Sequence, residues 1–207
     1  NFIRGREKEA IFTIFHNACA GNLELALVNG YSGIGKTALI NEMQKPIVEQ
    51  KGYFIKGKYD KFKRSIPYRA LIYSFKDLME QILAESEIRV SHWKKEILDS
   101  LGNNAKIITD VIPELETLIG EQPPVVELPP TESQNRFNLV FQEFVAVFCK
   151  EEHPLVLFLD DLQWADLPSL QLLKSMLTGN SRYIFFVFSY RSNEVTANHP
   201  FATLLEK

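Results

Sequence analysis

One glycine-rich stretch, residues 30–37, constrains the fold of this chain more than any other. It reads Gly-Tyr-Ser-Gly-Ile-Gly-Lys-Thr and matches the pattern G-x-x-x-x-G-K-[ST] at every fixed position. Residues 23–29 before it have the composition of a short buried strand, and residues 38–43 after it have the apolar spacing of a helix. Strand, loop and helix together form a cradle whose backbone N–H groups point at phosphate oxygens. The sequence therefore predicts a nucleoside-triphosphate site.

Two side chains of this loop have predicted chemical roles. Lys36 is expected to reach the β- and γ-phosphates, and the Thr37 hydroxyl is expected to ligate Mg²⁺. The alternative is a glycine-rich turn that binds nothing, but the agreement between motif and context favours the nucleotide. The residues expected to bind it are Gly30, Ser32, Gly33, Ile34, Gly35, Lys36, Thr37 and Ala38.

A second signature lies at residues 155–161, where a continuous apolar run ends in two carboxylates. Such a run is typical of a parallel strand buried on both faces, and ligands of α/β sheets bind at the carboxyl ends of the strands. Asp160 is therefore expected to hold Mg²⁺, and Asp161 to polarise the water that attacks the γ-phosphate. The alternative is a strand followed by an ordinary Asp turn.

The last predicted strand, residues 183–190, brings Arg191 to the same edge of the sheet. There Arg191 would sense the γ-phosphate with a charge that does not titrate, although an ordinary exposed arginine is the alternative. Asp166 either caps the helix that Pro168 begins or lies near Mg²⁺, where it would contact the ligands of the ion without binding the ion itself.

Length and charge limit the classes of function. A chain of 207 residues suits one α/β domain with an inserted piece, and a net charge of −3 gives no global basic field for nucleic acid. No apolar run is long enough to cross a bilayer, and the start without Met indicates a fragment of a larger protein. The four histidines form no cluster, so no metal ligand or catalytic histidine is assigned. The two cysteines lack metal-type spacing and are expected to be free thiols in a reducing compartment, which favours a cytoplasmic location.

The rest of the chain is predicted to be mostly helical. Pro46 is expected to break the helix after the phosphate loop near Lys45. Residues 58–64 interleave basic and aromatic residues, which suits either single-stranded nucleic acid or a solvated loop anchored by its aromatics. Near the start, Gly5 and Arg6 are expected in a turn before a helix, where they form a candidate clamp on the base or ribose. Further helices are expected at residues 67–85, 90–101, 103–110, 114–119, from a Thr131 or Ser133 cap to 150, and from 200 onward, with a further strand at 53–58.

Several segments together resemble a known family. Gly5-Arg6-Glu7, the phosphate loop, Asp160-Asp161 with the Leu-Gln-Trp-Ala-Asp that follows, and Ser189-Tyr190-Arg191 resemble the STAND clade of signalling P-loop ATPases, which are relatives of the AAA+ proteins. Residues 57–62 and 113–115 are similar to the ATPase module of multi-sensor signalling kinases. Those proteins place the module between a Ser/Thr kinase domain and GAF and histidine-kinase domains.

This resemblance implies an α/β P-loop NTPase fold, a three-layer sandwich with a mostly parallel sheet. A helical insertion of about residues 67–130 would lie between the second and third strands of one core domain spanning residues 1–207. The strand before Arg191 would lie between the phosphate-loop strand and the Asp160 strand. The lid and winged-helix region that usually follow would be absent, and the partners would be other domains of the same polypeptide or a second copy of the core.

The resulting hypothesis is a Mg²⁺-dependent ATPase switch domain, with Lys36, Asp161 and Arg191 as its catalytic residues. ATP is favoured over GTP because the chain lacks an Asn-Lys-x-Asp guanine reader and because of the resemblance. Three rivals are a nucleotide-binding scaffold with negligible turnover, a DNA-associated motor ATPase and a phosphotransferase to a small molecule, for whose acceptor pocket the sequence gives no sign. The motor predicts DNA-stimulated turnover that charge reversal at Lys61, Lys63 and Arg64 would abolish.

Overall fold

The computed structural model describes residues 2–31 and 35–206 of the chain. The chain divides into two compact units, which we call the sheet unit and the helical unit. The sheet unit comprises Asn1–Leu71 and Cys149–Lys207, and the helical unit comprises Ile72–Phe148.

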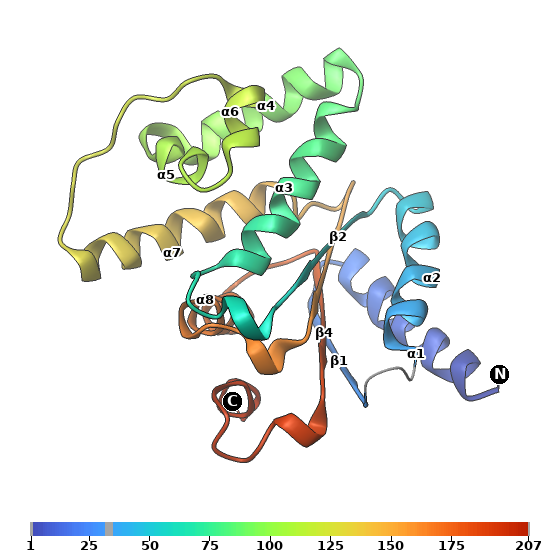
Figure 1. The fold of residues 1–207 in the computed structure, drawn as a ribbon. Coiled ribbons are helices and arrows are strands. Elements are labelled where there is room, and N and C mark those ends of the chain that lie inside the picture. The colour runs from blue at the N-terminus through green and yellow to red at the C-terminus, as the bar shows by residue number, and fades with distance from the viewer. Residues whose placement is uncertain (1, 32–34, 207) are drawn as a thin grey trace. The chain divides into compact units, whose positions relative to one another are not determined.

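A parallel sheet organises the sheet unit (Figure 1). Among the described residues it has four strands in the order β1-β4-β3-β2, so β4 lies between β1 and β3. This arrangement confirms the α/β class and the strand order that the family resemblance implied. The strands are β1 (Leu23–Asn29), β2 (Tyr53–Lys58), β3 (Leu155–Asp160) and β4 (Ile184–Tyr190).

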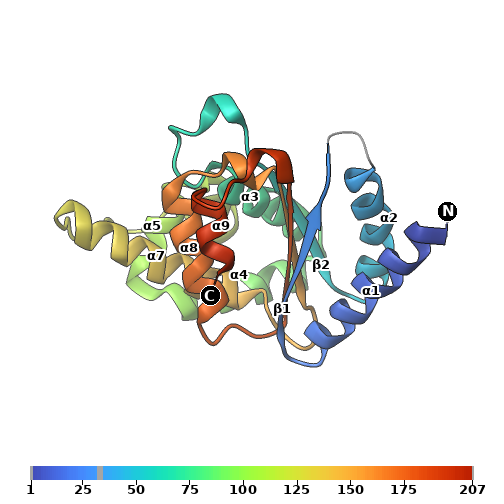
Figure 2. The same ribbon diagram turned by 90° about the horizontal axis from the view of Figure 1, so that it is seen from below.

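Helices cover both faces of this sheet, which gives the unit its three layers (Figure 2). Helices α1 (Phe2–Cys19) and α2 (Lys36–Glu49) lie on one face, and α8 (Leu167–Thr178) and α9 (Pro200–Leu205) lie on the other. Because side chains alternate along a strand, Val156 and Phe158 of β3 belong to the core under α1 and α2. The helical residues of that core include Ile11, Phe15, Ala18, Ile40, Met43 and Ile47.

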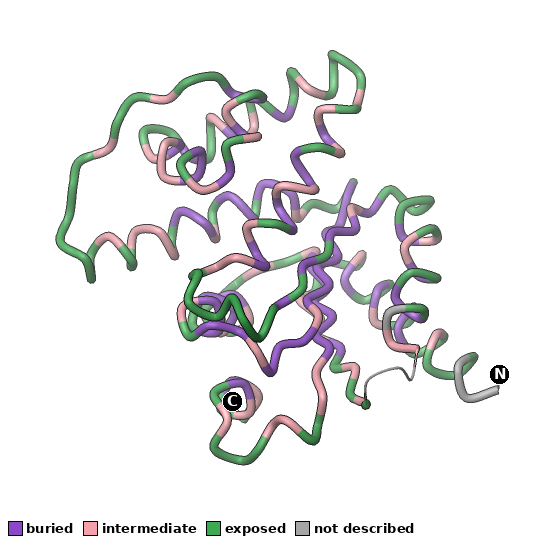
Figure 3. The backbone as a smooth tube through the Cα atoms, viewed as in Figure 1, coloured by how far each residue is buried: buried purple, intermediate pink, exposed green. Residues whose placement is uncertain are grey.

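The central strands β3 and β4 are buried on both faces, whereas the edge strands β1 and β2 are only partly buried (Figure 3). Every residue of β3 before Asp160 and every residue of β4 before Tyr190 is buried. In β1, by contrast, only Ala26 is buried, and Leu27 is 44% exposed. The apolar runs that predicted buried strands were therefore correct for β3 and β4 and overestimated the burial of β1.

Two predicted helix boundaries in the sheet unit were wrong. α1 already begins at Phe2, so Gly5 and Arg6 lie in its first turns and not in a turn before it. α2 continues through Pro46 to Glu49 without the predicted break. A proline inside a helix removes one backbone hydrogen bond, but buried Met43 and Ile47 pack on either side of it and hold both halves against the core.

The helical unit follows β2 in the chain and precedes β3. Helix α4 begins at Glu87, earlier than predicted, because Ser86 caps it. Helix α7 begins at Pro130, without the predicted cap by Thr131 or Ser133. An aromatic cluster forms its core, in which Phe75 contacts Phe141 and Phe144 of α7 and Trp93 contacts Phe148 directly after α7. The helices are α3 (Arg69–Leu83, from Ile72 on in this unit), α4 (Glu87–Leu101), α5 (Ala105–Thr109), α6 (Pro113–Ile119) and α7 (Pro130–Val147).

Candidate nucleotide site

The phosphate loop joins the carboxyl end of β1 to the N-terminus of α2. Gly35 is the N-cap of α2 and has a left-handed backbone (φ 89°, ψ 18°), which glycine adopts without steric cost. Within residues 2–31 and 35–206, no side chain caps this terminus and its first turn holds no acidic residue, so its N–H groups favour an anion. The predicted binding residues Ser32, Gly33 and Ile34 lie outside the described residues, as does the side chain of Thr37. Ala38 is exposed in the first turn of α2.

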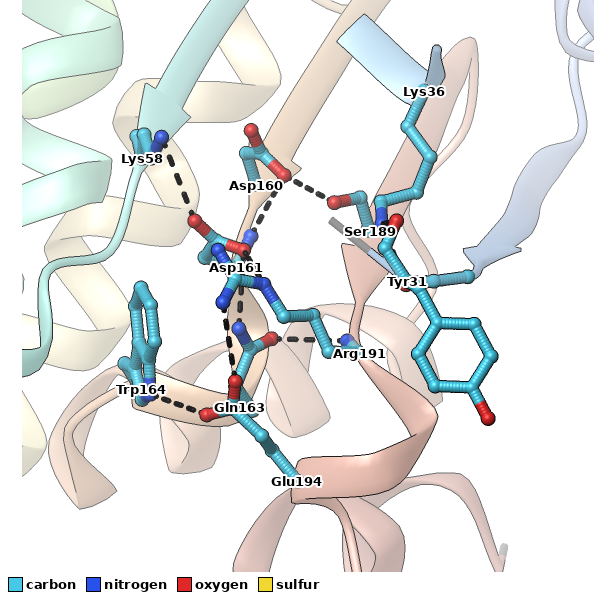
Figure 4. Close-up of polar contacts among 11 residues, drawn as sticks. Tyr31, Lys36, Lys58, Asp160, Asp161, Gln163, Trp164, Ser189, Arg191 and Glu194 are labelled. Carbon is cyan, nitrogen blue, oxygen red and sulfur yellow. Dashed lines mark hydrogen bonds and ion pairs between the residues drawn. The ribbon is translucent and has the colours of Figure 1, made fainter. Parts of the chain in front are cut away.

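The Lys36 side chain folds back over this loop. Its Nζ donates to the carbonyl oxygens of Gly30 at 2.6 Å and Tyr31 at 3.1 Å (Figure 4). These bonds keep the ammonium group at the loop, where a phosphate bound by the loop would meet it. The predicted contact of Lys36 with the β- and γ-phosphates stays a prediction.

Asp160 ends β3 beside the end of β4. The parallel register pairs Leu159 with Phe188, so the next residues, Asp160 and Ser189, lie level. The Ser189 hydroxyl donates to Asp160 Oδ1, which also accepts the backbone N–H of Asp161 at 2.9 Å. Asp160 itself is partly exposed, so one carboxylate is held by the protein and open to a ligand. A carboxylate of this kind fits Mg²⁺, which prefers oxygen ligands.

Asp161 is 4% exposed and has several charged and polar partners (Figure 4). Its Oδ1 accepts from Gln163 Nε2 at 3.0 Å and lies 3.6 Å from Arg191 Nε. Its Oδ2 lies 3.6 Å from Lys58 Nζ. The backbone of Asp161 is left-handed (φ 57°, ψ 47°), an uncommon conformation for a residue with a side chain and one that recurs at functional sites.

Arg191 follows β4 and reaches Asp161 from the neighbouring strand. Its backbone N–H donates to Gln163 Oε1 at 3.2 Å, and its Nη1 donates to Glu194 Oε1 at 3.2 Å. The guanidinium lies over the Trp164 ring, 4.9 Å from the ring centroid. The structure thus brings the predicted residues Asp160, Asp161 and Arg191 together at one edge of the sheet.

Sequence reasoning did not assign an individual role to five residues of this cluster: Lys58, Gln163, Trp164, Ser189 and Glu194. Gln163 and Ser189 lie within segments that carried the family resemblance, and Lys58 ends a predicted strand at the same edge, so weak signals existed. The sequence analysis contained no indication for Glu194, because its contact with Arg191 depends on the 3₁₀ helix at Ser192–Glu194, which was not predicted.

A cleft of about 700 Å³ lies next to the loop. Its lining is mostly apolar, with Glu7, Asn29 and Lys36 as polar members. Glu7 lines it from α1, whereas Gly5 and Arg6, the predicted clamp residues, are exposed and do not line it. The apolar residues that line it are Ala10, Ile11, Ile14, Leu25, Ala26, Leu27, Val28 and Leu39.

Asp166 is the N-cap of α8. Its Oδ2 accepts the backbone N–H groups of Ser169 at 2.9 Å and Tyr68 at 3.2 Å, and its Oδ1 accepts the Ser169 hydroxyl at 2.7 Å. The sequence left two roles open for Asp166, as a helix cap or as a residue near Mg²⁺, and these bonds support the role of helix cap.

The fold and the site define a class of protein. A parallel sheet with the order β1-β4-β3-β2, a glycine loop after β1 and a carboxylate pair at the carboxyl end of β3 are the features of a P-loop nucleoside-triphosphate-binding domain. Residues 2–187 match the model of the AAA ATPase domain, and the chain belongs to this family.

Two curated relatives are signalling kinases. "Hybrid signal transduction histidine kinase G" of Dictyostelium discoideum is 42% identical over 179 residues, which are 86% of this chain and 5% of the relative. "Histidine protein kinase 1" of Candida albicans is 25% identical over 197 residues, which are 87% of this chain and 8% of the relative. The chain therefore spans less than a tenth of the length of either relative, and it resembles the ATPase module of signal-transduction kinases. Across the residues that the structure describes, no helix is both long and apolar enough to span a membrane.

Proposed function

We propose that this chain is a Mg²⁺-dependent domain that binds and hydrolyses ATP and acts as a switch in a larger signal-transduction protein. The observation that supports this best is the position of β4 between β1 and β3. The phosphate loop, Asp160 and Arg191 consequently follow the carboxyl ends of three adjacent strands, which is where open α/β sheets bind their ligands.

In the proposed reaction, the oxygen of a water molecule forms a bond to the γ-phosphorus. The bond from the γ-phosphorus to the β,γ-bridging oxygen breaks, and ADP leaves with the electron pair. Asp161 orients this water and takes its proton, Lys36 and the loop amides offset the phosphate charge, and Arg191 contacts the γ-phosphate.

Asp160 and Thr37 would hold Mg²⁺, and the hydroxyl of Ser189 would orient the Asp160 carboxylate toward it. When bound, this ion would offset the negative charge of the β- and γ-phosphates. The support for this assignment is the partly exposed Asp160 carboxylate described above.

We further propose that the cleft beside the loop accepts the base. Its apolar lining suits the faces of a purine ring, and Glu7 and Asn29 provide polar groups beside it. Gly5 and Arg6, which directly precede Glu7 on α1, remain candidates for contact with the base or ribose. The preference for ATP over GTP stays a prediction, which rests on the lack of an Asn-Lys-x-Asp guanine-recognition motif and on the family resemblance.

The signalling role rests on the two relatives, whose names describe histidine kinases. We propose that this chain is likewise one module of a multidomain polypeptide and belongs to the STAND clade. Its partners would be a lid and the kinase or sensor domains, together with a second copy of the core. We also propose that residues 1–207 form one ATPase core, with the segment of about 67–130 inserted between β2 and β3. A cytoplasmic location is part of the same proposal.

A nucleotide-binding scaffold with negligible turnover is the second candidate. The observation that favours it is the crowded surroundings of Asp161, whose carboxylate already contacts Lys58, Gln163 and Arg191. A base that keeps all three partners has little capacity to accept a proton from water.

Calorimetric titration of ATP with Mg²⁺ present tests the proposal, with the wild type, Lys36→Ala and Lys45→Ala compared side by side. The Lys45 side chain lies on the same helix, is 85% exposed and, among the described residues, forms an ion pair with Glu49 alone, so its variant removes an equal charge away from the loop. Loss of the charge-assisted bonds from Lys36 should weaken ATP binding about 10- to 100-fold. The proposal fails if the wild type does not bind ATP or if Lys36→Ala binds as well as Lys45→Ala. Measurable phosphate release by the binding-competent wild type then separates the ATPase from the scaffold.

A further inference from the structure

Arg191 and Glu194 form an ion pair within a closed arrangement of three side chains (Figure 4). Glu194 Oε1 accepts from Arg191 Nη1 at 3.2 Å, and Glu194 Oε2 accepts from Trp164 Nε1 at 2.9 Å. The Arg191 guanidinium lies over the Trp164 ring at 4.9 Å. Each member therefore contacts both others, and we call this group the arginine clasp.

The clasp holds the side chain of Arg191 while other contacts hold its backbone. The backbone N–H of Arg191 donates to Gln163, which is 1% exposed and in turn donates to Asp161. The main chain at the end of β4 is thus anchored independently of Glu194. Movement of the guanidinium toward a ligand would therefore come from rotation of the Arg191 side chain, which would separate it from Glu194 and from Asp161, its second carboxylate partner.

An arginine shared between a carboxylate and a phosphate can form its best bonds with only one of them. The guanidinium stays charged, and 26% of the Arg191 side chain and 32% of the Glu194 side chain are exposed, so exchange between partners needs no unfolding of the core. A γ-phosphate must therefore compete with the Glu194 carboxylate for Arg191. ADP has no γ-phosphate and does not enter this competition.

We propose that Glu194 is a specificity-determining residue, which acts through Arg191 to set the ratio of ATP affinity to ADP affinity. The carboxylate lowers the affinity for ATP by the free energy of the broken ion pair and leaves the affinity for ADP unchanged. Trp164 positions both partners of the pair. This inference rests on the proposed function, because it requires a nucleotide bound at the phosphate loop.

The test is Glu194→Gln, measured by displacement of a fluorescent ATP analogue with ATP and, separately, with ADP. The glutamine amide oxygen can still accept from Trp164 Nε1, but the negative charge of Glu194 is gone, while the ion pair of Arg191 with Asp161 stays in both proteins. A partly exposed ion pair of this kind corresponds to a change of about two- to fivefold in affinity, so ATP should bind about two- to fivefold more tightly while ADP binds as before. A purely structural role for Glu194 predicts no gain. Glu194→Ala, a second variant, should shift ATP affinity in the same direction.

Two controls separate this inference from its alternatives. Glu152→Gln makes the same charge change on an exposed turn of the sheet unit and should leave both affinities unchanged. In an Arg191→Met background, Glu194→Gln should have no effect on ATP affinity, because the residue through which it acts is gone.

The inference is overturned if Glu194→Gln leaves the ATP-to-ADP affinity ratio unchanged in a chain that binds both nucleotides. It is also overturned if the gain persists in the Arg191→Met background or appears equally with ADP. A wild type that binds neither nucleotide refutes the proposed function and, with it, the inference. These results are distinguishable, because the wild-type affinities are measured in the same assay.

Discussion

Replacement of Gly57 by alanine tests how the chain positions the candidate active site. Gly57 lies in β2, directly before Lys58, which pairs with Asp161. A Cβ at position 57 would lie 2.3 Å from the carbonyl oxygen of Ala70 and 3.0 Å from its carbonyl carbon. Contacts of a Cβ below 3.0 Å are essentially unknown, and both atoms belong to the backbone, so no side-chain rotation can relieve the clash.

The cost follows from this distance. The contact is 0.7 Å too short, so the start of α3 or the end of β2 must move by at least that amount. Overpacking of this kind typically costs about 1–3 kcal/mol, and we expect the upper half of that range because backbone must move. For a chain of this size each kcal/mol lowers the melting temperature by about 2–4 °C, so Gly57→Ala should melt roughly 4–12 °C below the wild type.

Thermal unfolding followed by circular dichroism measures this shift, and Gly5→Ala is the matched control. Apart from its chain neighbours and the backbone of its own helix, a Cβ at Gly5 meets no atom of the described residues within 4 Å, and Gly5 lies in a helix, where alanine is favoured by up to about 1 kcal/mol. The control should therefore melt at the wild-type temperature or slightly above it. If Gly57→Ala melts with the control, Ala70 does not approach β2 as described, and the reasoning is refuted.

Three further predictions concern the site and the helical unit. Asp161→Asn should reduce phosphate release by about 100-fold or more while ATP affinity changes little, and an unchanged rate would remove Asp161 from the mechanism. Chelation of Mg²⁺ should weaken ATP binding in the wild type but not in Asp160→Asn, and equal losses in both would argue against Asp160 as a ligand. Burial raises the pKa of the Glu114 carboxyl, but a hydrogen bond from its own backbone N–H and the Lys76 ammonium outweigh burial and hold that pKa below its ordinary value. The helical unit should therefore keep this stabilisation above the ordinary glutamate pKa of about 4.3 and lose it as the pH falls through the lower pKa of the folded state. The melting temperatures of the wild type and of Lys76→Met should then converge in acid. Melting temperatures that differ by the same amount at every pH would contradict this prediction.

The sequence alone determined the local elements and the kinds of residue at the site. Apolar runs ending in Asp160 and before Arg191 identified β3 and β4, because a strand buried on both faces needs continuous apolar side chains. The glycine pattern predicted the loop before α2, since only a few spacings can present backbone N–H groups to phosphate. The break predicted at Pro46 was wrong because the rule for an isolated helix ignores the packing of Met43 and Ile47.

The partners of each side chain were decided by the tertiary structure. Lys58 and Arg191 both meet Asp161 only because β2, β3 and β4 end at one edge in register. No spacing in the sequence encodes these contacts, since 103 positions separate Lys58 from Asp161, and which strands become neighbours depends on how the whole chain packs its apolar faces. The left-handed backbone of Asp161 has the same origin, because the surrounding contacts hold a conformation that an isolated Asp rarely adopts. Local propensity therefore accounts for the strands and the loop, while the charge network that surrounds the candidate catalytic carboxylate exists only in the folded sheet.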